Sequence, residues 1–271
     1  MKLGVTLPQF TGDPHALLRS ARRAAAAGPD SVWVFDHLWP LSGGKERPIL
    51  ECWSTLAWIA GALEEKVIIG TLVTRSSLRN PALLARMAAT VADMAPGRVI
   101  VGIGSGDAAS RPENEAFGIP YWEGEERHDQ LFETAAAVRA HLAGRAPVWI
   151  GGRSRAIRRA AGRVADAWNG WGGTPERFAR DAREVKGARL TWGGLAVLAS
   201  TDTAAAEKAG KRNPAEYVIG GPARLAGHLA GIAAAGAEHA VITFPDAAAS
   251  GPYELLGGEV RSKLDAARRS A

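Results

Sequence analysis

Cysteine is nearly absent from this sequence: Cys52 is the one thiol among 271 residues. A lone thiol cannot form an internal disulfide, and such a chain is typical of the reducing cytoplasm. The longest apolar stretches, "VIIGTLV" and "VIVGIG", are far too short to span a bilayer, and the first residues form no apolar signal segment. We therefore expect a cytoplasmic protein with no membrane partner.

Several catalytic motifs are also missing. The six histidines are dispersed, so no metal cluster is expected, and no G-x-S-x-G nucleophile elbow is present. The run "VGIGSGD" spaces its glycines as G-x-G-x-G and has Asp107 where a dinucleotide fingerprint needs its third glycine, which rejects a Rossmann site. Glycines at these points would instead let a flat ligand approach the strand end closely.

The formal charge of +5 does not indicate a nucleic-acid-binding protein, because the arginines are scattered and no basic run carries interleaved aromatic residues. One local cluster contains Arg153, Arg155, Arg158, Arg159 and Arg163. It is either a solvated helix face or a surface that attracts an anionic small ligand. We expect a small-molecule substrate and no nucleic-acid partner.

The sequence does contain a regular alternation of strand and helix patterns. Most strand-type runs are continuously apolar, as strands covered on both faces should be. The eight runs are "KLGVTLP", "DSVWVFDH", "KVIIGTLV", "RVIVGIGSG", "APVWIGG", "DAWNGW", "LTWGGLAVLA" and "HAVITFP". Helix starts are marked by Asp13–Pro14, Asn80–Pro81 and Thr174–Pro175, and helix ends by Gly28 and Gly236.

Eight strand–helix units in 271 residues predict a (β/α)8 TIM barrel. A doubly wound open sheet uses the same unit, but the count of eight favours the barrel. No linker or shift in composition divides the chain, so we expect one domain over residues 1–271. Because catalytic residues of this fold follow the strand carboxyl ends, residues at those ends are the candidates for chemistry.

Two such ends carry acid–base candidates. The second strand ends in Asp36–His37, and a long segment, "DAASRPENEAFGIPYWEGEER", follows the fourth strand and begins with Asp107. Long loops in compact domains are usually functional. His37 is either a hydrogen-bonded structural residue or a group that exchanges a proton with a substrate hydroxyl, and Asp107 could be its partner acid.

A third candidate is "WIGGRSRAI", where Gly151, Gly152, Arg153 and Ser154 join the fifth strand to a helix. Free backbone N–H groups, the helix dipole and an arginine suit a phosphate, although a glycine turn with a serine cap explains the same pattern. Among nine tryptophans, Trp33 and Trp149 are expected in the core. Those at strand ends could form aromatic walls for a planar ring; they are Trp39, Trp168 and Trp171.

These residues, in this order and spacing, resemble the luciferase-like monooxygenase superfamily, and within it the branch that uses the deazaflavin coenzyme F420. The resemblance covers nearly the whole chain. It is carried by "GPDSVWVFDH", "IIGTLV", "LRNPALLARMAATVADMAPGRVIVGIGSG", "NEAFGIP", "PVWIGGRS", "VADAWNGW" and "IGGPARLAGHLAGIAAAGAEHAVI".

The resemblance implies a luciferase-like barrel that holds the coenzyme ring at the strand carboxyl ends. Asp36 would contact the coenzyme, His37 would be the active-site base, and a non-prolyl cis peptide would join Leu72 to Val73. The resemblance also assigns residues to two loops. Ser105, Gly106 and Asp107 match a "GTGE" motif whose glutamate donates a proton, and Gly151, Gly152, Arg153 and Ser154 match the phosphate loop.

The implied activity is hydride transfer between coenzyme F420 and a small organic substrate, with Trp39 and Trp171 facing that substrate. Alternatives are an FMN-dependent two-component monooxygenase and a flavin-binding protein without catalysis. The segment after the seventh strand, "ASTDTAAAEKAGKRNPAEYVIGG", is short for this family. A short segment there implies an open substrate mouth, or one completed by the second subunit of a homodimer.

Overall fold

Parallel strands pair edge to edge around a closed ring in the computed structural model of the chain, which describes residues 1–40, 44–63, 66–249 and 251–270. The ring closes because β6 pairs with β7 as well as with β5. The strands are β1 (Lys2–Thr6), β2 (Ser31–Val34), β3 (Ile68–Arg75), β4 (Val99–Gly104), β5 (Val148–Gly151), β6 (Ala167–Trp171), β7 (Arg189–Leu198) and β9 (Ala237–Thr243). All eight predicted strands are present, and the (β/α)8 barrel is confirmed.

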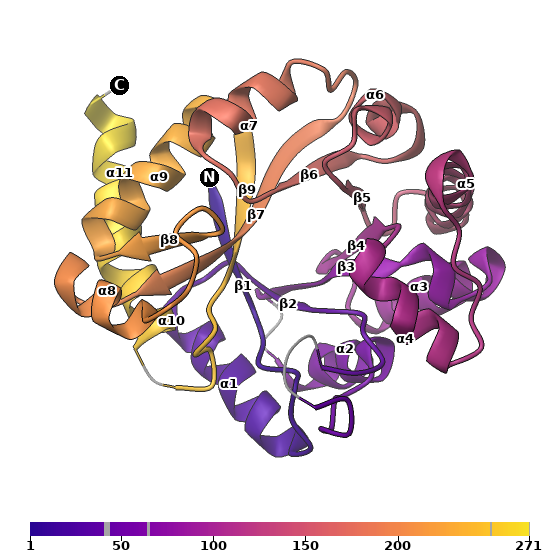
Figure 1. Cartoon of the computed structure of the whole chain (residues 1–271), viewed down its shortest axis with the longest axis horizontal. Helices are drawn as coiled ribbons and strands as arrows, with labels where there is room; N and C mark the ends of the chain where they lie inside the picture. The colour runs from indigo at the N-terminus through magenta and orange to yellow at the C-terminus, as the bar shows by residue number, and fades with distance from the viewer. Residues whose placement is uncertain (41–43, 64–65, 250, 271) are drawn as a thin grey trace.

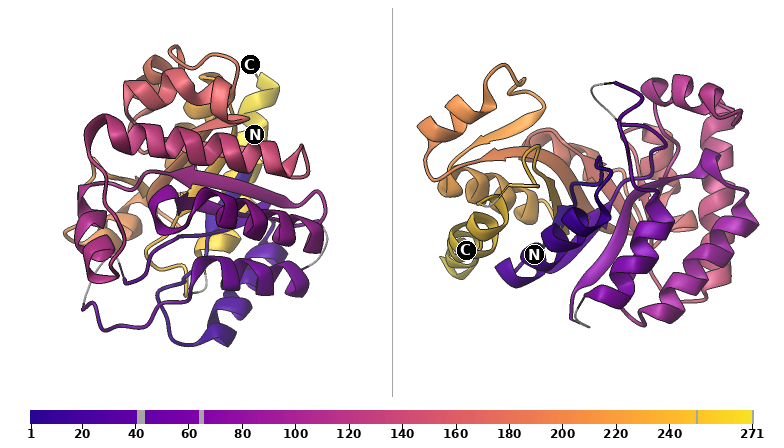
Figure 2. Two further views of the ribbon diagram at one scale, coloured as in Figure 1. Left: turned by 90° about the vertical axis from the view of Figure 1, so that its right-hand side faces the viewer. Right: turned by 90° about the horizontal axis from the view of Figure 1, so that it is seen from below.

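Helices surround this barrel on all sides (Figure 1), and α3 and α5 lie side by side on its outer surface (Figure 2). The helices are α1 (Pro14–Ala27), α2 (Cys52–Ala62), α3 (Pro81–Met94), α4 (Arg111–Ala116), α5 (Gly124–Leu142), α6 (Arg155–Val164), α7 (Pro175–Ala182), α8 (Asp202–Ala209), α9 (Pro222–Ala234), α10 (Pro252–Leu255) and α11 (Arg261–Ser270). The carboxyl ends of the barrel strands form the upper end of the barrel, and their amino ends form the lower end.

The predicted helix boundaries follow local hydrogen bonding. Asn80 Oδ1 accepts from Ala82 N–H at 2.9 Å, and Thr174 Oγ1 accepts from Arg177 N–H at 3.3 Å. Asp13 also precedes its helix, but its side chain makes no capping bond. Gly28 ends α1 with φ of 107°, a conformation that glycine adopts without strain.

A ninth strand, β8 (Tyr217–Gly220), was not predicted. It pairs with the second half of β7, Leu195–Leu198, beyond the residues of β7 that pair with β6. In Figure 1, β8 and α8 lie outside the barrel beside α9. The strand is four residues long and mostly half-buried, so its sequence lacks the continuous apolar run that marks the barrel strands.

The barrel interior is closed by aromatic side chains. Trp33 and Trp149 are 0% and 3% exposed, with ring centroids 4.8 Å apart, which confirms that both belong to the core. His239 lies edge-on to both rings, and its Nε2 is 2.8 Å from Ser31 Oγ. These three rings form an aromatic layer inside the barrel.

The predicted cis peptide between Leu72 and Val73 is present. The glycines of β4 and β5 adjoin it: a Cβ at Gly104 would lie 2.4 Å from Val73 Cγ2, and one at Gly151 would lie 3.1 Å from Val73 Cγ1. At Gly102 a Cβ would lie 2.2 Å from the carbonyl oxygen of Thr71. These glycines therefore make room first for β3 itself, not only for a ligand as the sequence suggested.

We predict that Gly102→Ala lowers the free energy of unfolding by about 1–3 kcal/mol, because the opposing Thr71 carbonyl belongs to a paired strand and cannot move aside. Gly227→Ala is the matched control, because Gly227 lies inside α9 with no atom within 4 Å of its added Cβ. That change should raise stability by about 0.5–1 kcal/mol through helix propensity. Urea unfolding of both variants makes the comparison, and equal stability of the two would contradict the steric account.

Candidate active site

The end of β2 is fixed by a buried glutamine. Gln9 is 0% exposed; its Oε1 accepts from Phe35 N–H at 2.8 Å, and its Nε2 donates to the carbonyls of Phe35 and Leu50. These bonds replace the backbone pairing that stops with β2, so the chain leaves the barrel at a defined point. Asp36 and His37 follow directly at the upper end, as the sequence predicted.

His37 is held by a carboxylate from the long loop after β4. Its Nδ1 lies 3.0 Å from Glu113 Oε2 in α4, and the other carboxylate oxygen accepts from Leu38 N–H. Burial raises the pKa of Glu113, but the bonds from His37 and Leu38 and the charge of Arg75 outweigh burial, so the pKa is lowered. An ionised carboxylate only accepts hydrogen bonds, so Nδ1 carries a proton, and in the neutral ring the lone pair is on Nε2.

Asp36 is buried in a separate ion pair. Its Oδ2 accepts from Thr74 Oγ1 at 2.5 Å and from Arg79 Nη1 at 2.6 Å, and Oδ1 accepts from Arg79 Nη2 at 3.1 Å. The side chain is 1% exposed. Arg79 continues to Glu51, the N-cap of α2, at 2.6 Å. Anchoring Arg79 is a structural role that the sequence did not indicate, and contact with a coenzyme stays a prediction.

Arg75, the last residue of β3, connects the two carboxylates. Its Nη2 lies 3.1 Å from Glu113 Oε2, its Nε donates to the Asp36 carbonyl at 3.2 Å, and its Nη1 donates to Asn114 Oδ1 at 2.9 Å. The side chain is 4% exposed. One buried network therefore joins the ends of β2 and β3 to α4.

Asp107 does not contact His37 in this arrangement. It is exposed and caps a short 3₁₀ helix, Ala108–Ser110, by accepting from Ser110 Oγ at 3.2 Å. The preceding Gly106 has φ of 69° and adjoins the Arg75 side chain. Burial lowers the pKa of Arg75, and the charges of Glu113, Asp36 and Asp107 partly oppose that effect. The acid beside His37 is thus Glu113, which sequence reasoning missed although it lies in the loop marked as functional.

The predicted phosphate loop lies between β5 and α6. Ser154 caps α6 by accepting from Ile157 N–H at 3.3 Å, and its hydroxyl is also 3.1 Å from His128 Nε2. Gly152 has φ of 149°, and a Cβ there would meet Ile157 Cδ1 at 2.4 Å, so the turn requires glycine. Arg153 is exposed, and its side chain has no ion pair within the described residues.

Two arginines of the cluster form ion pairs. Arg155 and Arg158 pair with Glu184 at 3.2 and 3.0 Å, and Arg158 also lies 3.7 Å from Asp181. These contacts join α6 to the end of α7 and the residues after it. Arg153, just before α6, makes no such ion pair among the described residues.

The tryptophans at the strand ends have different surroundings. Trp39 is half-buried and meets Phe117 edge-on at 6.4 Å, so the loops after β2 and β4 touch there. Trp171 is half-buried and packs over Gly193 beside the aromatic layer of the barrel. Trp168 is 1% exposed and stacks on Phe178, so the prediction that it forms part of an aromatic wall is wrong.

The lowered pKa of Glu113 predicts a specific acid sensitivity. A carboxyl with a depressed folded pKa contributes stability above its unfolded value of 4.5, and that contribution is lost as the pH falls through the folded value. Between about pH 7 and about pH 3.5, Glu113→Gln should therefore lose less unfolding free energy than the parent protein. Glu115→Gln, exposed on the same helix, should follow the parent curve in unfolding measurements. Parallel curves for all three proteins would show that Glu113 is not coupled to folding.

Comparison with known proteins agrees with this architecture. A curated relative, the F420-dependent glucose-6-phosphate dehydrogenase of Beutenbergia cavernae, is 37% identical over 150 residues, which cover 53% of this chain and 42% of that protein. The enzyme of the same name from Microbacterium testaceum is 31% identical over 182 residues, 57% of this chain and 52% of its own. The chain thus matches about half the length of these relatives.

Two solved structures share the fold over nearly the whole chain. An F420-dependent secondary alcohol dehydrogenase in complex with an F420-acetone adduct aligns with a TM-score of 0.80 and 18% identity, covering 97% of this chain and 98% of its own. An EDTA monooxygenase from Chelativorans sp. aligns at 0.76 with 15% identity, covering 98% and 94%. The family described as luciferase-like monooxygenase matches this chain over residues 1–258. This chain belongs to the luciferase-like monooxygenase family.

Proposed function

We propose that this protein is an oxidoreductase that uses coenzyme F420 to oxidise or reduce a small organic substrate. The observation that carries the proposal is the histidine at the upper end of the barrel, His37, whose Nδ1 is held by a buried carboxylate. The names of the curated relatives support the choice of coenzyme. The FMN-dependent alternative shares the fold, so the coenzyme has to be decided by binding.

The residues at the upper end fit a flat, phosphate-bearing coenzyme. Gly151, Gly152, Arg153 and Ser154 combine a glycine turn, a capped helix start and an unpaired arginine, which suit a phosphate. Leu72, Val73, Ser105 and Gly106 would border the ring. Coenzyme F420, when bound, carries a hydride to or from the substrate.

The protein's own contribution is to position the substrate and move one proton. The His37 side chain is 18% exposed, so its Nε2 can reach a substrate while Nδ1 stays bonded to Glu113. With Nε2 unprotonated, His37 accepts the hydroxyl proton when an alcohol is oxidised and returns it in the reverse direction. Glu113 keeps the ring in this tautomer and stabilises the imidazolium that forms.

Other predicted residues keep their roles as proposals. Asp107 would be a second proton donor from the loop after β4, where its exposure leaves it accessible to a bound molecule. Asp36 would contact the coenzyme from the ion pair that it forms with Arg79. Trp39 and Trp171 would border the substrate. A homodimer and a cytoplasmic location also stay predictions; Cys52 is a free, buried thiol.

We predict that coenzyme F420 binds more tightly than FMN in equilibrium titrations of the oxidised and reduced forms. Arg153→Gln should weaken F420 binding by about 1–3 kcal/mol, the range for a charge-assisted hydrogen bond. Arg159→Gln is the control, since Arg159 is exposed further along the same helix. Tighter binding of FMN than of F420 would overturn the coenzyme assignment. Equal losses of F420 affinity in Arg153→Gln and Arg159→Gln would indicate diffuse electrostatic attraction instead of a specific phosphate site.

We predict that His37→Asn keeps fold and coenzyme affinity but slows hydride transfer on the order of 10²–10⁴-fold, the usual contribution of a positioned base. Single-turnover measurements with F420 isolate the chemical step, and glucose 6-phosphate is the first substrate to assay because the curated relatives are named for it. Glu113→Gln should slow the same step by less, because His37 stays in place with a weaker partner. Loss of coenzyme binding or folding in His37→Asn would show that the histidine is structural.

A further inference from the structure

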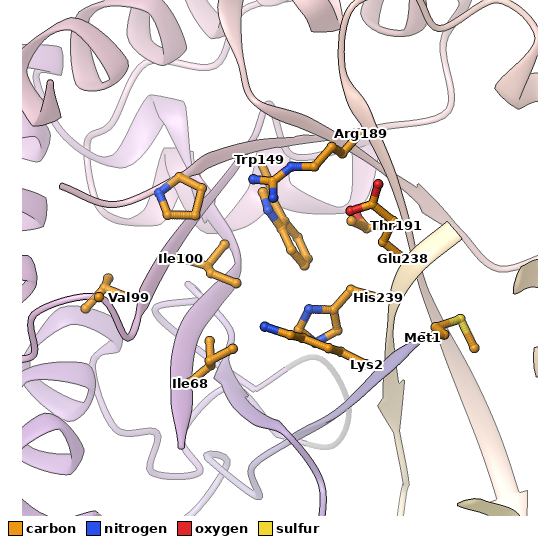
Figure 3. A pocket seen from close by; sticks show the side chains of 12 residues that line it. Met1, Lys2, Ile68, Val99, Ile100, Trp149, Arg189, Thr191, Glu238 and His239 are labelled. Carbon is orange, nitrogen blue, oxygen red and sulfur yellow. The ribbon is translucent and has the colours of Figure 1, made fainter. Parts of the chain in front are cut away.

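A cavity of about 470 Å³ opens at the lower end of the barrel, opposite the candidate active site (Figure 3). It lies where the strands begin, on the far side of the aromatic layer. One wall is apolar and consists of Ile68, Val99, Ile100, Pro147 and Trp149. The other wall is polar and consists of Lys2, Arg189, Thr191, Glu238 and His239.

The charged residues of the polar wall are unpaired. Lys2, Arg189 and Glu238 are exposed, and none of their side chains makes a hydrogen bond or an ion pair within the part of the chain that the structure describes. In Figure 3 the Arg189 side chain lies near Trp149 and the Lys2 side chain lies near His239. Lys2 and Arg189 outnumber Glu238 at the mouth, and the N-terminal ammonium of Met1 adds to the positive charge that acts on His239. This excess of positive charge favours an anionic ligand.

His239 adds a neutral polar group at the floor of the cavity. Its Nε2 lies 2.8 Å from Ser31 Oγ, which also accepts from Trp33 Nε1–H at 2.7 Å. Burial lowers the pKa of His239 to about 3, so the ring is neutral. No described residue bonds to its Nδ1, and the ring is only 4% exposed.

The apolar wall supplies a surface for an apolar body. Trp149 lines the cavity together with Ile68 and Ile100 (Figure 3), and its indole is 3% exposed there. A flat apolar ring placed along this wall buries apolar area. A planar body on this side and a negative group on the other would use both walls at once.

We propose that the lower cavity binds a small carboxylate with a planar apolar body, such as an aromatic carboxylic acid. The carboxylate meets Lys2 and Arg189, and the ring lies along the apolar wall. This site is separate from the coenzyme site, and it does not depend on the function proposed above.

The test is calorimetric titration of the full chain with 2-naphthoate and with 2-naphthamide, its neutral isostere. We expect 2-naphthoate to bind with one molecule per chain and the amide to bind at least about tenfold more weakly. Arg189→Gln and Lys2→Gln should each weaken 2-naphthoate binding about three- to thirtyfold. Lys211→Gln, an exposed lysine away from the cavity, should bind as the parent does.

Three outcomes would overturn the proposal: no binding of 2-naphthoate, equal binding of acid and amide, or unchanged binding in both Arg189→Gln and Lys2→Gln. Displacement of 2-naphthoate by coenzyme F420 would also overturn it, because it would place the probe at the upper end. Tryptophan fluorescence gives a second readout, since quenching that disappears in Trp149→Phe locates the probe in the lower cavity. Failure here leaves the coenzyme titrations unaffected, so the two proposals fail separately.

Discussion

The upper end of the barrel depends on the carboxylate of Glu113. It accepts hydrogen bonds from His37 and Leu38 after β2, and it pairs with Arg75 at the end of β3. Arg75 in turn donates to the carbonyl of Asp36. Taking these charges out of water is costly, and the cost is offset because each group has several partners. Three connections that are distant in sequence are thereby fixed relative to one another, and the histidine receives one defined orientation.

Much of the architecture could be predicted from the sequence. Barrel strands buried on both faces are mostly continuous apolar runs, so the eight could be recognised from such runs between helix patterns. Asn80 and Thr174 mark helix starts through local hydrogen bonds. β8 was missed because a short, half-buried strand has no such run. Asp36 and His37 follow the carboxyl end of β2, so strand direction alone predicts that they lie at the upper end of the barrel.

The side-chain partners could not be predicted in the same way. Glu113 and Asp107 both lie in the loop after β4, and the sequence singled out Asp107 because it directly follows the strand. Helix α4 turns the chain back so that Glu113, six residues further on, reaches His37. Such a contact depends on how a loop folds in three dimensions. Gln9 was missed for the same reason, since its bonds to Phe35 and Leu50 join segments that no local pattern connects.

The shortness of β5 has a mechanical consequence. The strand is four residues long, Val148–Gly151, so Trp149 on the wall of the lower cavity and Gly151 at the predicted phosphate loop are two positions apart. An extended backbone hardly stretches, so the separation of these two positions is nearly fixed. The wall of the lower cavity and the start of that loop therefore share one short segment of strand, and neither position can move far along the barrel axis without the other.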